Sequence, residues 1–206
     1  EFHEKFLGGN FKKYYTYSDS IPNTFRLNDE DKIDCLVLED KNTTGLCGDP
    51  SLYKKTLEDG RTLNDIHIFN NVFGKQSKLK DASKGGSEGE GRQTFCLASD
   101  IRTFFYFTKR EDGSEYFMGI FYCGAFEAFG KEYSTFARFG NTVLPQDSKG
   151  REWSKPIGDQ KQIDEFKKIF NITRDEPGTT IVIPYVKNSI TLDECEKVIL
   201  EGYRAT

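Results

Sequence analysis

The chain has 206 residues, of which 36% are hydrophobic and 30% are charged, the composition of a folded globular domain that can bury a core. This excludes a predominantly disordered protein. The net charge of −4, from 29 basic and 33 acidic side chains, gives no surplus of Lys and Arg. Direct nucleic acid binding, which needs such a surplus, is therefore not expected of this segment.

The cysteines and the apolar stretches limit the chemistry and the location of the chain. Five cysteines at wide spacing, without a C-x-x-C pair, predict neither a disulfide framework nor a metal site. Cys35 and Cys195 lie in apolar patterns and are expected to be buried free thiols, which favours a reducing, cytoplasmic location. No stretch approaches the roughly 18 apolar residues of a membrane span, and the charged start of the chain is not typical of a signal peptide.

The first half of the chain shows weak local signals. Residues 1–7 alternate loosely between apolar and polar and predict a strand, whereas residues 8–31 are rich in turn formers and predict a loop. Residues 33–38 form a short apolar run, typical of a strand buried on both faces. Residues 41–92 are expected to form a long connection with one helix over 63–72. A connection of this length is typical of a functional lid or of a disordered segment, and the lid is favoured here.

The second half shows stronger signals. A helix is predicted at 94–99, followed by a strand at 101–109 that is rich in Phe and Tyr. Asp112 and Gly113 predict a hairpin turn, and residues 116–123 are expected to form the partner strand. Residues 124–160 contain many glycines and prolines and are expected to be irregular.

The end of the chain completes the expected fold class. Apolar residues at helical spacing predict an amphipathic helix at 160–170. A strand is predicted at 179–186, and the capping box Thr191-x-x-Glu194 predicts a final helix. The expected class is α+β, with a mostly antiparallel mixed sheet covered by helices in a two-layer sandwich. The aromatic strands are expected to form its core.

Three stretches contain residues that a nucleotide site needs. The run from Leu36 to Gly48 is apolar, ends on acidic residues and then turns on small ones. The run from Lys84 to Arg92 holds four glycines in seven positions between a lysine and an arginine. An acid on a turn can accept a hydrogen bond from an adenine amino group, and a glycine-rich loop at a helix start can bind phosphates. The third stretch is Gly178-Thr179-Thr180.

Each stretch also has a commoner interpretation. Asp40 alone favours a strand-end turn with a local hydrogen bond, and residues 84–92 alone are equally typical of a flexible linker. Gly178-Thr179-Thr180 alone is an ordinary turn into a strand. The three together, in this order, favour a nucleotide site.

Three motifs follow one another along the chain: a strand ending in Asp, a G-G-S-x-G-x-G run before a helix, and a late Gly-Thr-Thr strand. This order resembles that of the ATP-binding domain of the GHKL superfamily. This superfamily includes type II topoisomerases, MutL mismatch-repair proteins, histidine kinases and the Microrchidia ATPases. The closest resemblance is to prokaryotic stand-alone GHKL proteins. It covers residues 1–187 and implies a Bergerat-like fold with a lid at about 70–93, followed by a C-terminal helix at 188–206 that leads to a further region.

The resemblance also assigns roles to residues. Asp40 would accept a hydrogen bond from the adenine amino group, helped by a threonine hydroxyl. Asn42 stands where the family often has a glycine, and Asn tolerates the same left-handed turn. Arg92 or Lys84 would supply positive charge to the phosphates. The implied ATP-binding set is Asp40, Asn42, Gly45, Gly48, Lys84, Gly86, Ser87, Gly89, Gly91, Arg92, Thr179 and Thr180.

The resemblance implies ATP and Mg²⁺ as cofactors, slow hydrolysis, and lid closure coupled to formation of a homodimer or larger assembly. One part of the family pattern is not found: a helix with Glu-x-x-x-Asn, which supplies the catalytic base and the Mg²⁺ ligand. This helix is expected upstream of residue 1, so no catalytic residue is assigned. Two alternatives stay open. One is a nucleotide-gated interaction module without hydrolysis, and the other is a domain whose aromatic strands bind a protein partner.

Overall fold

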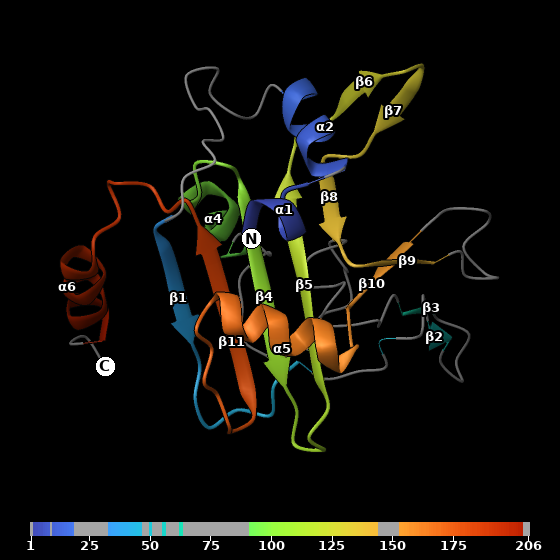
Figure 1. Cartoon of the computed structure of the whole chain (residues 1–206). Helices are drawn as coiled ribbons and strands as arrows, with labels where there is room; N and C mark the ends of the chain where they lie inside the picture. Colours follow the sequence, from blue (N-terminus) through green and yellow to red (C-terminus); the bar gives the residue numbers. More distant parts are fainter. Residues whose placement is uncertain are drawn as a thin grey trace.

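The computed structural model describes residues 2–8, 10–18, 33–46, 50, 55–56, 62–63, 91–143 and 153–203. A five-stranded sheet forms its centre, in the spatial order β1-β11-β4-β5-β8, and every neighbouring pair is antiparallel (Figure 1). The strands are β1 (Cys35–Glu39), β11 (Gly178–Pro184), β4 (Thr103–Lys109), β5 (Glu115–Tyr122) and β8 (Phe136–Phe139). With the helices that pack on it, this sheet confirms the expected α+β class.

The central β4–β5 hairpin follows from local sequence. Its turn contains Gly113 with φ of +82°, and Oδ1 of Asp112 accepts a hydrogen bond from N of Ser114 at 2.9 Å. Both faces of β4 are covered, so residues 104–107 are at most 1% exposed. The expectation that the aromatic strands form the core is confirmed.

Helix α5 (Gln160–Ile169) and the short helix α1 (Phe2–Phe6) cover one face of the sheet (Figure 1). The carboxylate of Asp159 caps α5 by accepting a backbone hydrogen bond at 3.0 Å. Phe166 of α5 is fully buried and stacks on Phe117 of β5, with ring centroids 4.5 Å apart. The predicted amphipathic helix is confirmed.

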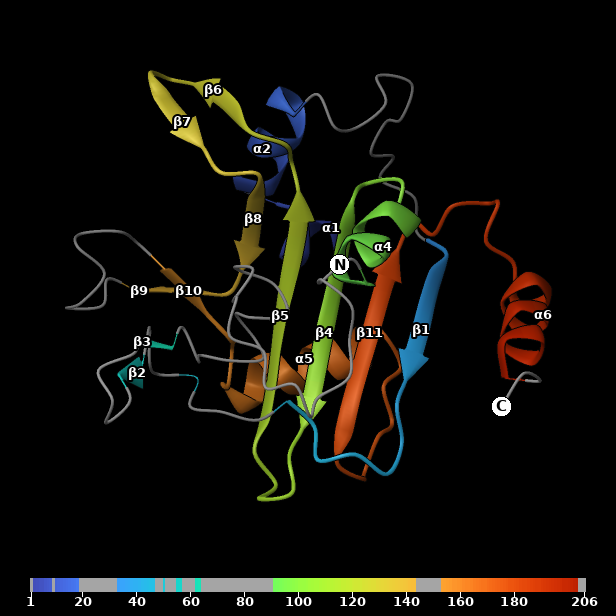
Figure 2. The same ribbon diagram turned by 180° about the vertical axis from the view of Figure 1, so that it is seen from behind.

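Helix α4 (Gly91–Ala98) contacts the opposite face, which Figure 2 shows from the front. Its Cys96 is buried in a cluster with Phe104 and Tyr106 of β4. The helix predicted at 94–99 is confirmed, and it begins earlier, at the last glycine of the glycine-rich stretch.

Helix α6 (Leu192–Tyr203) begins with the predicted capping box. N of Glu194 donates to Oγ1 of Thr191 at 3.2 Å, and N of Thr191 donates to Oε2 of Glu194 at 3.4 Å. The helix stands beside β1, apart from the sheet (Figure 1), and Leu192 is 75% exposed. In the part of the chain that the structure describes, no helix has the length and apolarity that crossing a membrane requires.

The prediction of a strand at residues 1–7 is wrong, because these residues enter α1. Phe6 and Leu7 are both buried, and the ring of Phe6 meets that of Phe105 edge-on at 5.5 Å. Successive strand residues point to opposite faces, so a strand could bury only one of these two neighbours on the sheet.

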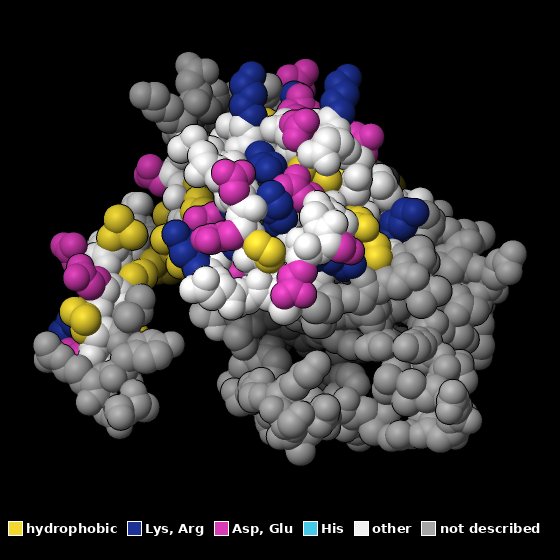
Figure 3. Space-filling model, turned by 90° about the horizontal axis from the view of Figure 1, so that it is seen from below, with side chains coloured by type: hydrophobic (Ala, Val, Ile, Leu, Met, Phe, Trp, Pro, Cys, Tyr) yellow, Lys and Arg dark blue, Asp and Glu magenta, His cyan; other side chains and the backbone are white. Residues whose placement is uncertain are grey.

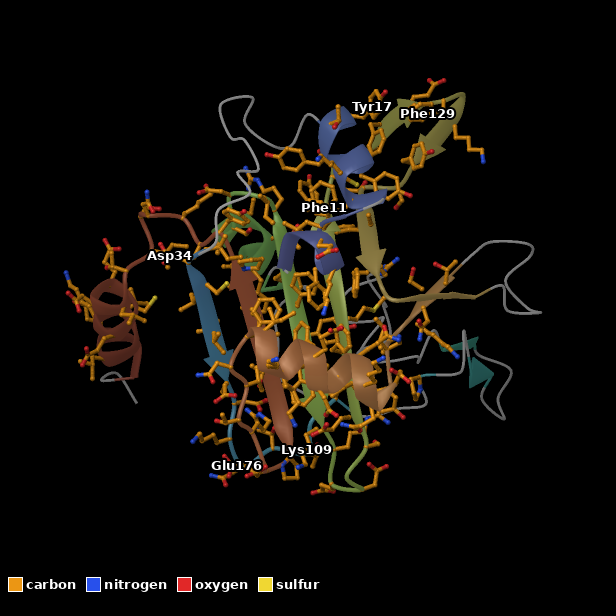
Figure 4. The ribbon with its side chains drawn as sticks, in the orientation of Figure 1. Phe11, Tyr17, Asp34, Lys109, Phe129 and Glu176 are labelled. Atoms are coloured by element: carbon orange, nitrogen blue, oxygen red, sulfur yellow. The ribbon has the colours of Figure 1, made fainter. Side chains whose placement is uncertain are left out.

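The prediction of a loop over residues 8–31 is wrong for residues that form α2 (Asn10–Tyr17). Residues 9 and 19–31 of this range lie outside the described residues. Tyr17 of α2 packs edge-on against Phe129 at 5.2 Å (Figure 4). Because such ring partners lie far along the chain, the local pattern of turn formers did not indicate the helix.

The prediction of irregular structure over residues 124–160 is also wrong. Besides β8, the described part of this range contains four short strands that form two antiparallel pairs, whereas residues 144–152 lie outside the described residues. They are β6 (Phe126–Ala128), β7 (Lys131–Tyr133), β9 (Asn141–Val143) and β10 (Trp153–Lys155). Strands of three residues are too short to show alternation, and the glycines between them signal only turns.

Strand β1 is an edge strand, so the prediction that it is buried on both faces is wrong. Its neighbour in the sheet is β11, and Val37 and Leu38 are each 39% exposed. Further along, β2 (Lys55–Thr56) pairs with β3 (Thr62–Leu63). Residue 63, the first residue of the helix predicted over 63–72, therefore belongs to a strand. Residues 64–72 lie outside the described residues.

The expected burial of Cys35 and Cys195 is confirmed only in part, since both are half-buried free thiols. Burial, with a smaller contribution from Asp34, raises the pKa of Cys35 to about 11. At neutral pH this cysteine is therefore almost entirely a thiol, which is the unreactive form.

Candidate functional site

Asp40 and Thr179 meet where β1 ends and β11 begins. The register of the two strands pairs Glu39 with Thr180. N of Asp40 donates to O of Thr179 at 3.1 Å, and N of Thr179 donates back to Oδ1 of Asp40 at 2.5 Å. Two of the predicted site residues, 139 positions apart in the sequence, are thus joined at the lower end of the sheet (Figure 1).

The hydroxyl of Thr180 contacts the neighbouring acid rather than Asp40. Its Oγ1 donates to Oε1 of Glu39 at 3.1 Å and accepts a hydrogen bond from Nε of Arg174 at 3.2 Å. The resemblance places a threonine hydroxyl beside the adenine-binding acid. In the structure, the backbone N–H of Thr179 contacts that acid instead.

The turn that follows β1 adopts the expected backbone conformation. Asn42 has φ of +58° and Gly45 has φ of +73°, in the left-handed region that Asn tolerates and Gly adopts freely. N of Leu46 donates to Oγ1 of Thr108 at 2.8 Å, and this hydroxyl donates to O of Gly178 at 3.1 Å. One buried hydroxyl on β4 therefore ties the turn to the start of β11.

Gly45→Ala is expected to lower the free energy of unfolding by more than about 2 kcal/mol, because a left-handed Ala alone costs roughly 1–2 kcal/mol. A Cβ at Gly45 would also lie 2.5 Å from O of Lys109 and 2.7 Å from Oγ1 of Thr108. Urea unfolding measures the loss. Gly130→Ala is the matched control, since Gly130 has φ of +69° but no atom within 4 Å of the added Cβ. Equal losses in the two variants would contradict the close packing of the turn on β4.

A pocket of about 530 Å³ lies beside this turn. Apolar side chains of β1, the turn, α4 and β11 form most of its lining, and three polar residues lie among them. The apolar set is Val37, Leu38, Leu46, Phe95 and Ile181, and the polar residues are Glu39, Asp40 and Thr179. Apolar walls with a few placed polar groups are typical of sites for small aromatic ligands.

Helix α4 links the pocket to the glycine-rich stretch. Phe95 lines the pocket, and Gly91 and Arg92 are the first residues of the same helix. The free N–H groups at a helix N-terminus favour anions such as phosphate. The other predicted residues of this group lie outside the described residues: Gly48, Lys84, Gly86, Ser87 and Gly89.

A second pocket, of about 440 Å³, shares Glu39 with the first but is lined mainly by charged residues. Seen from below (Figure 3), acidic and basic side chains are interspersed over this end of the molecule. Such a lining does not suit an apolar base. Within the described ranges, no group of three or more His, Cys, Asp and Glu side chains is placed to hold a metal ion, so no residue is assigned to Mg²⁺.

Two residues of this site carry no signal in the sequence. Thr108 lies near the end of an aromatic strand and Arg174 lies in a charged turn, and both positions are typical of the surface. In the structure Thr108 is fully buried and Arg174 is 6% exposed. Their partners are distant in the sequence, so neither could be found from local pattern.

The chain was compared with protein-family models, with curated proteins and with solved structures, and none of them matches it. What this site binds is therefore inferred from its own residues and from the order of its motifs.

Proposed function

We propose that this chain binds ATP and that the pocket between β1, β11 and α4 holds the adenine base. The observation that carries the proposal is the Asp40 carboxylate in an otherwise largely apolar pocket. The N–H of Thr179 occupies Oδ1. Among the described residues, no hydrogen bond engages Oδ2, which leaves one acceptor for a ligand.

The chemistry of this acceptor favours adenine over guanine. Adenine carries an amino donor where guanine carries a carbonyl acceptor. An ionised carboxylate only accepts hydrogen bonds. A carboxylate that faces this position of the ring therefore pairs with the adenine amino group and is repelled by the guanine carbonyl, since the N–H donors of guanine lie elsewhere on its ring. Hydrogen bonds to charged groups contribute about 1.5–3 kcal/mol. Leu38 and Ile181 would lie against the apolar surface of the base.

The resemblance extends the proposal to a GHKL-type domain with a Bergerat-like fold in the cytoplasm. Binding of ATP with Mg²⁺ would close the lid and support a homodimer or larger assembly. Both changes would be coupled to a downstream effector region. Slow hydrolysis is proposed only for a protein that contains the Glu/Asn helix, which would supply the base and the metal ligand. The residues described above bind and orient the base.

Calorimetric titration with a non-hydrolysable ATP analogue and Mg²⁺ tests the proposal. We expect saturable binding with one site per chain and binding at least tenfold weaker for the corresponding GTP analogue. A well-folded protein that gives no heat with either analogue would contradict the proposal. Phosphate release from ATP then separates an ATPase from a nucleotide-gated module that binds without hydrolysis.

The alternative of a partner-binding surface on the aromatic strands is not supported by the burial of their side chains. Phe104, Phe105, Tyr106 and Phe107 are all at most 1% exposed. Side chains this deeply buried cannot contact a partner while the sheet keeps its helices.

A further inference from the structure

Arg174 is a buried arginine in the loop between α5 and β11. Its side chain is only 2% exposed. Burying a guanidinium is costly unless its donors are paired and its charge is balanced. The contacts of this guanidinium therefore have to offset the cost of its burial.

The guanidinium of Arg174 joins the two strand ends that carry the site. Nη2 donates to the backbone oxygens of Asp40 and of Thr179, the latter at 3.1 Å. Nη1 donates to O of Pro177 at 3.2 Å, and Nε donates to Oγ1 of Thr180 at 3.2 Å. These four hydrogen bonds use most of the five N–H donors of an arginine.

The same guanidinium faces two carboxylates. Nη2 lies 3.6 Å from Oδ1 of Asp40, and Nε lies 3.8 Å from Oε1 of Glu39. Opposite charges at these separations attract each other. Arg174 therefore holds Asp40 in position through its backbone oxygen and its side chain together.

Gly178 provides the space that this arrangement needs. Its φ is +150°, a conformation that side-chain-bearing residues rarely adopt. A Cβ there would overlap the guanidinium of Arg174 and lie 2.5 Å from Oδ1 of Asp40. The glycine of the Gly-Thr-Thr stretch thus allows the arginine and the aspartate to approach each other.

We propose that Arg174 is the positioning residue that sets base selectivity: it holds Asp40 as an acceptor for the amino group of adenine without touching the nucleotide. This inference rests on the proposed ATP site. A phosphate contact is not favoured for Arg174, because the acids that line its pocket outnumber the bases. Glu39, Asp175 and Glu176 lie there against Lys41 and Arg174, and these acids would repel an anion.

The test compares the ATP analogue with the analogue of purine riboside triphosphate, in which hydrogen replaces the amino group. For the wild type, we expect the amino group to improve the dissociation constant by about tenfold or more, as a hydrogen bond to a charged acceptor does. Arg174→Lys keeps the positive charge. A single ammonium group cannot reach all the oxygens that the planar guanidinium contacts at once. The variant is expected to lose most of this tenfold ratio while its affinity for the purine analogue changes by less than about threefold.

The outcomes distinguish the inference from the proposed function. One outcome is that Arg174→Lys weakens the binding of both analogues equally, so that the ratio of their dissociation constants stays as in the wild type; another is that the variant binds both as the wild type does. Either outcome means that the arginine has no part in selectivity and overturns the inference. ATP binding by the wild type would still stand. If the wild type binds neither analogue, both fall. Should Arg174→Lys not fold, Thr180→Val decides in its place. It removes the oxygen that accepts from Nε, so an unchanged ratio in this isosteric variant overturns the inference.

Discussion

Asp40→Asn is expected to weaken binding of the ATP analogue by about 10- to 100-fold, the energy of one hydrogen bond to a charged acceptor. The amide oxygen can still accept the hydrogen bond from N of Thr179. The amide nitrogen then replaces the free oxygen and presents a donor to the amino donor of adenine. For the same reason, the preference for the ATP analogue over the GTP analogue is expected to fall. Calorimetric titration measures both effects.

Asp34→Asn is the matched control for this variant. Asp34 is an exposed aspartate at the opposite end of β1, and Figure 4 shows it far from the lower end of the sheet. The variant removes the same charge without changing the pocket, so its affinity is expected to equal that of the wild type. Equal weakening in both variants would mean that net charge, not the Asp40 contact, governs binding. Wild-type affinity in Asp40→Asn would exclude Asp40 as the adenine acceptor.

Phe166→Ala is expected to lower the free energy of unfolding by about 3–5 kcal/mol, the usual cost of removing a buried phenylalanine. Phe166 is fully buried between α5 and the sheet. Its ring lies 4.5 Å from that of Phe117, 4.8 Å from that of Phe170 and 5.7 Å from that of Phe6. Urea or guanidinium unfolding measures the loss.

Lys161→Ala provides the control on the same helix. Lys161 is exposed, and substitutions at such positions usually change stability by no more than about 0.5 kcal/mol. A loss below about 1 kcal/mol in Phe166→Ala would contradict the packing of α5 on the sheet. Because α5 and α4 contact opposite faces, the fraction of Phe166→Ala that remains folded is expected to bind the ATP analogue as the wild type does.

Elements whose signals lie within one segment were predicted well. The β4–β5 turn needs only Asp112 and Gly113, and the start of α6 needs only Thr191 and Glu194. The apolar spacing of α5 is also contained in the helix itself. In each case the interaction that forms the element joins residues a few positions apart, so the amino-acid pattern contains it.

Elements that depend on distant partners were predicted poorly. α1 forms because Phe6 and Leu7 are buried on the sheet, and β8 is placed by its pairing with β5. The edge position of β1 depends on its pairing with β11. None of these partners is visible in a window of neighbouring residues.

The candidate site divides in the same way. The amino-acid sequence alone contains the order of the three motifs: an acid after a strand, a glycine-rich stretch before a helix, and a Gly-Thr-Thr strand. It also contains the tolerance of Asn42 and Gly45 for a left-handed turn. The hydrogen bonds between Asp40 and Thr179, and the guanidinium of Arg174 between them, exist only in the folded chain. Strand pairing and the burial of a charge join residues more than a hundred positions apart, and no local pattern specifies which of them will meet.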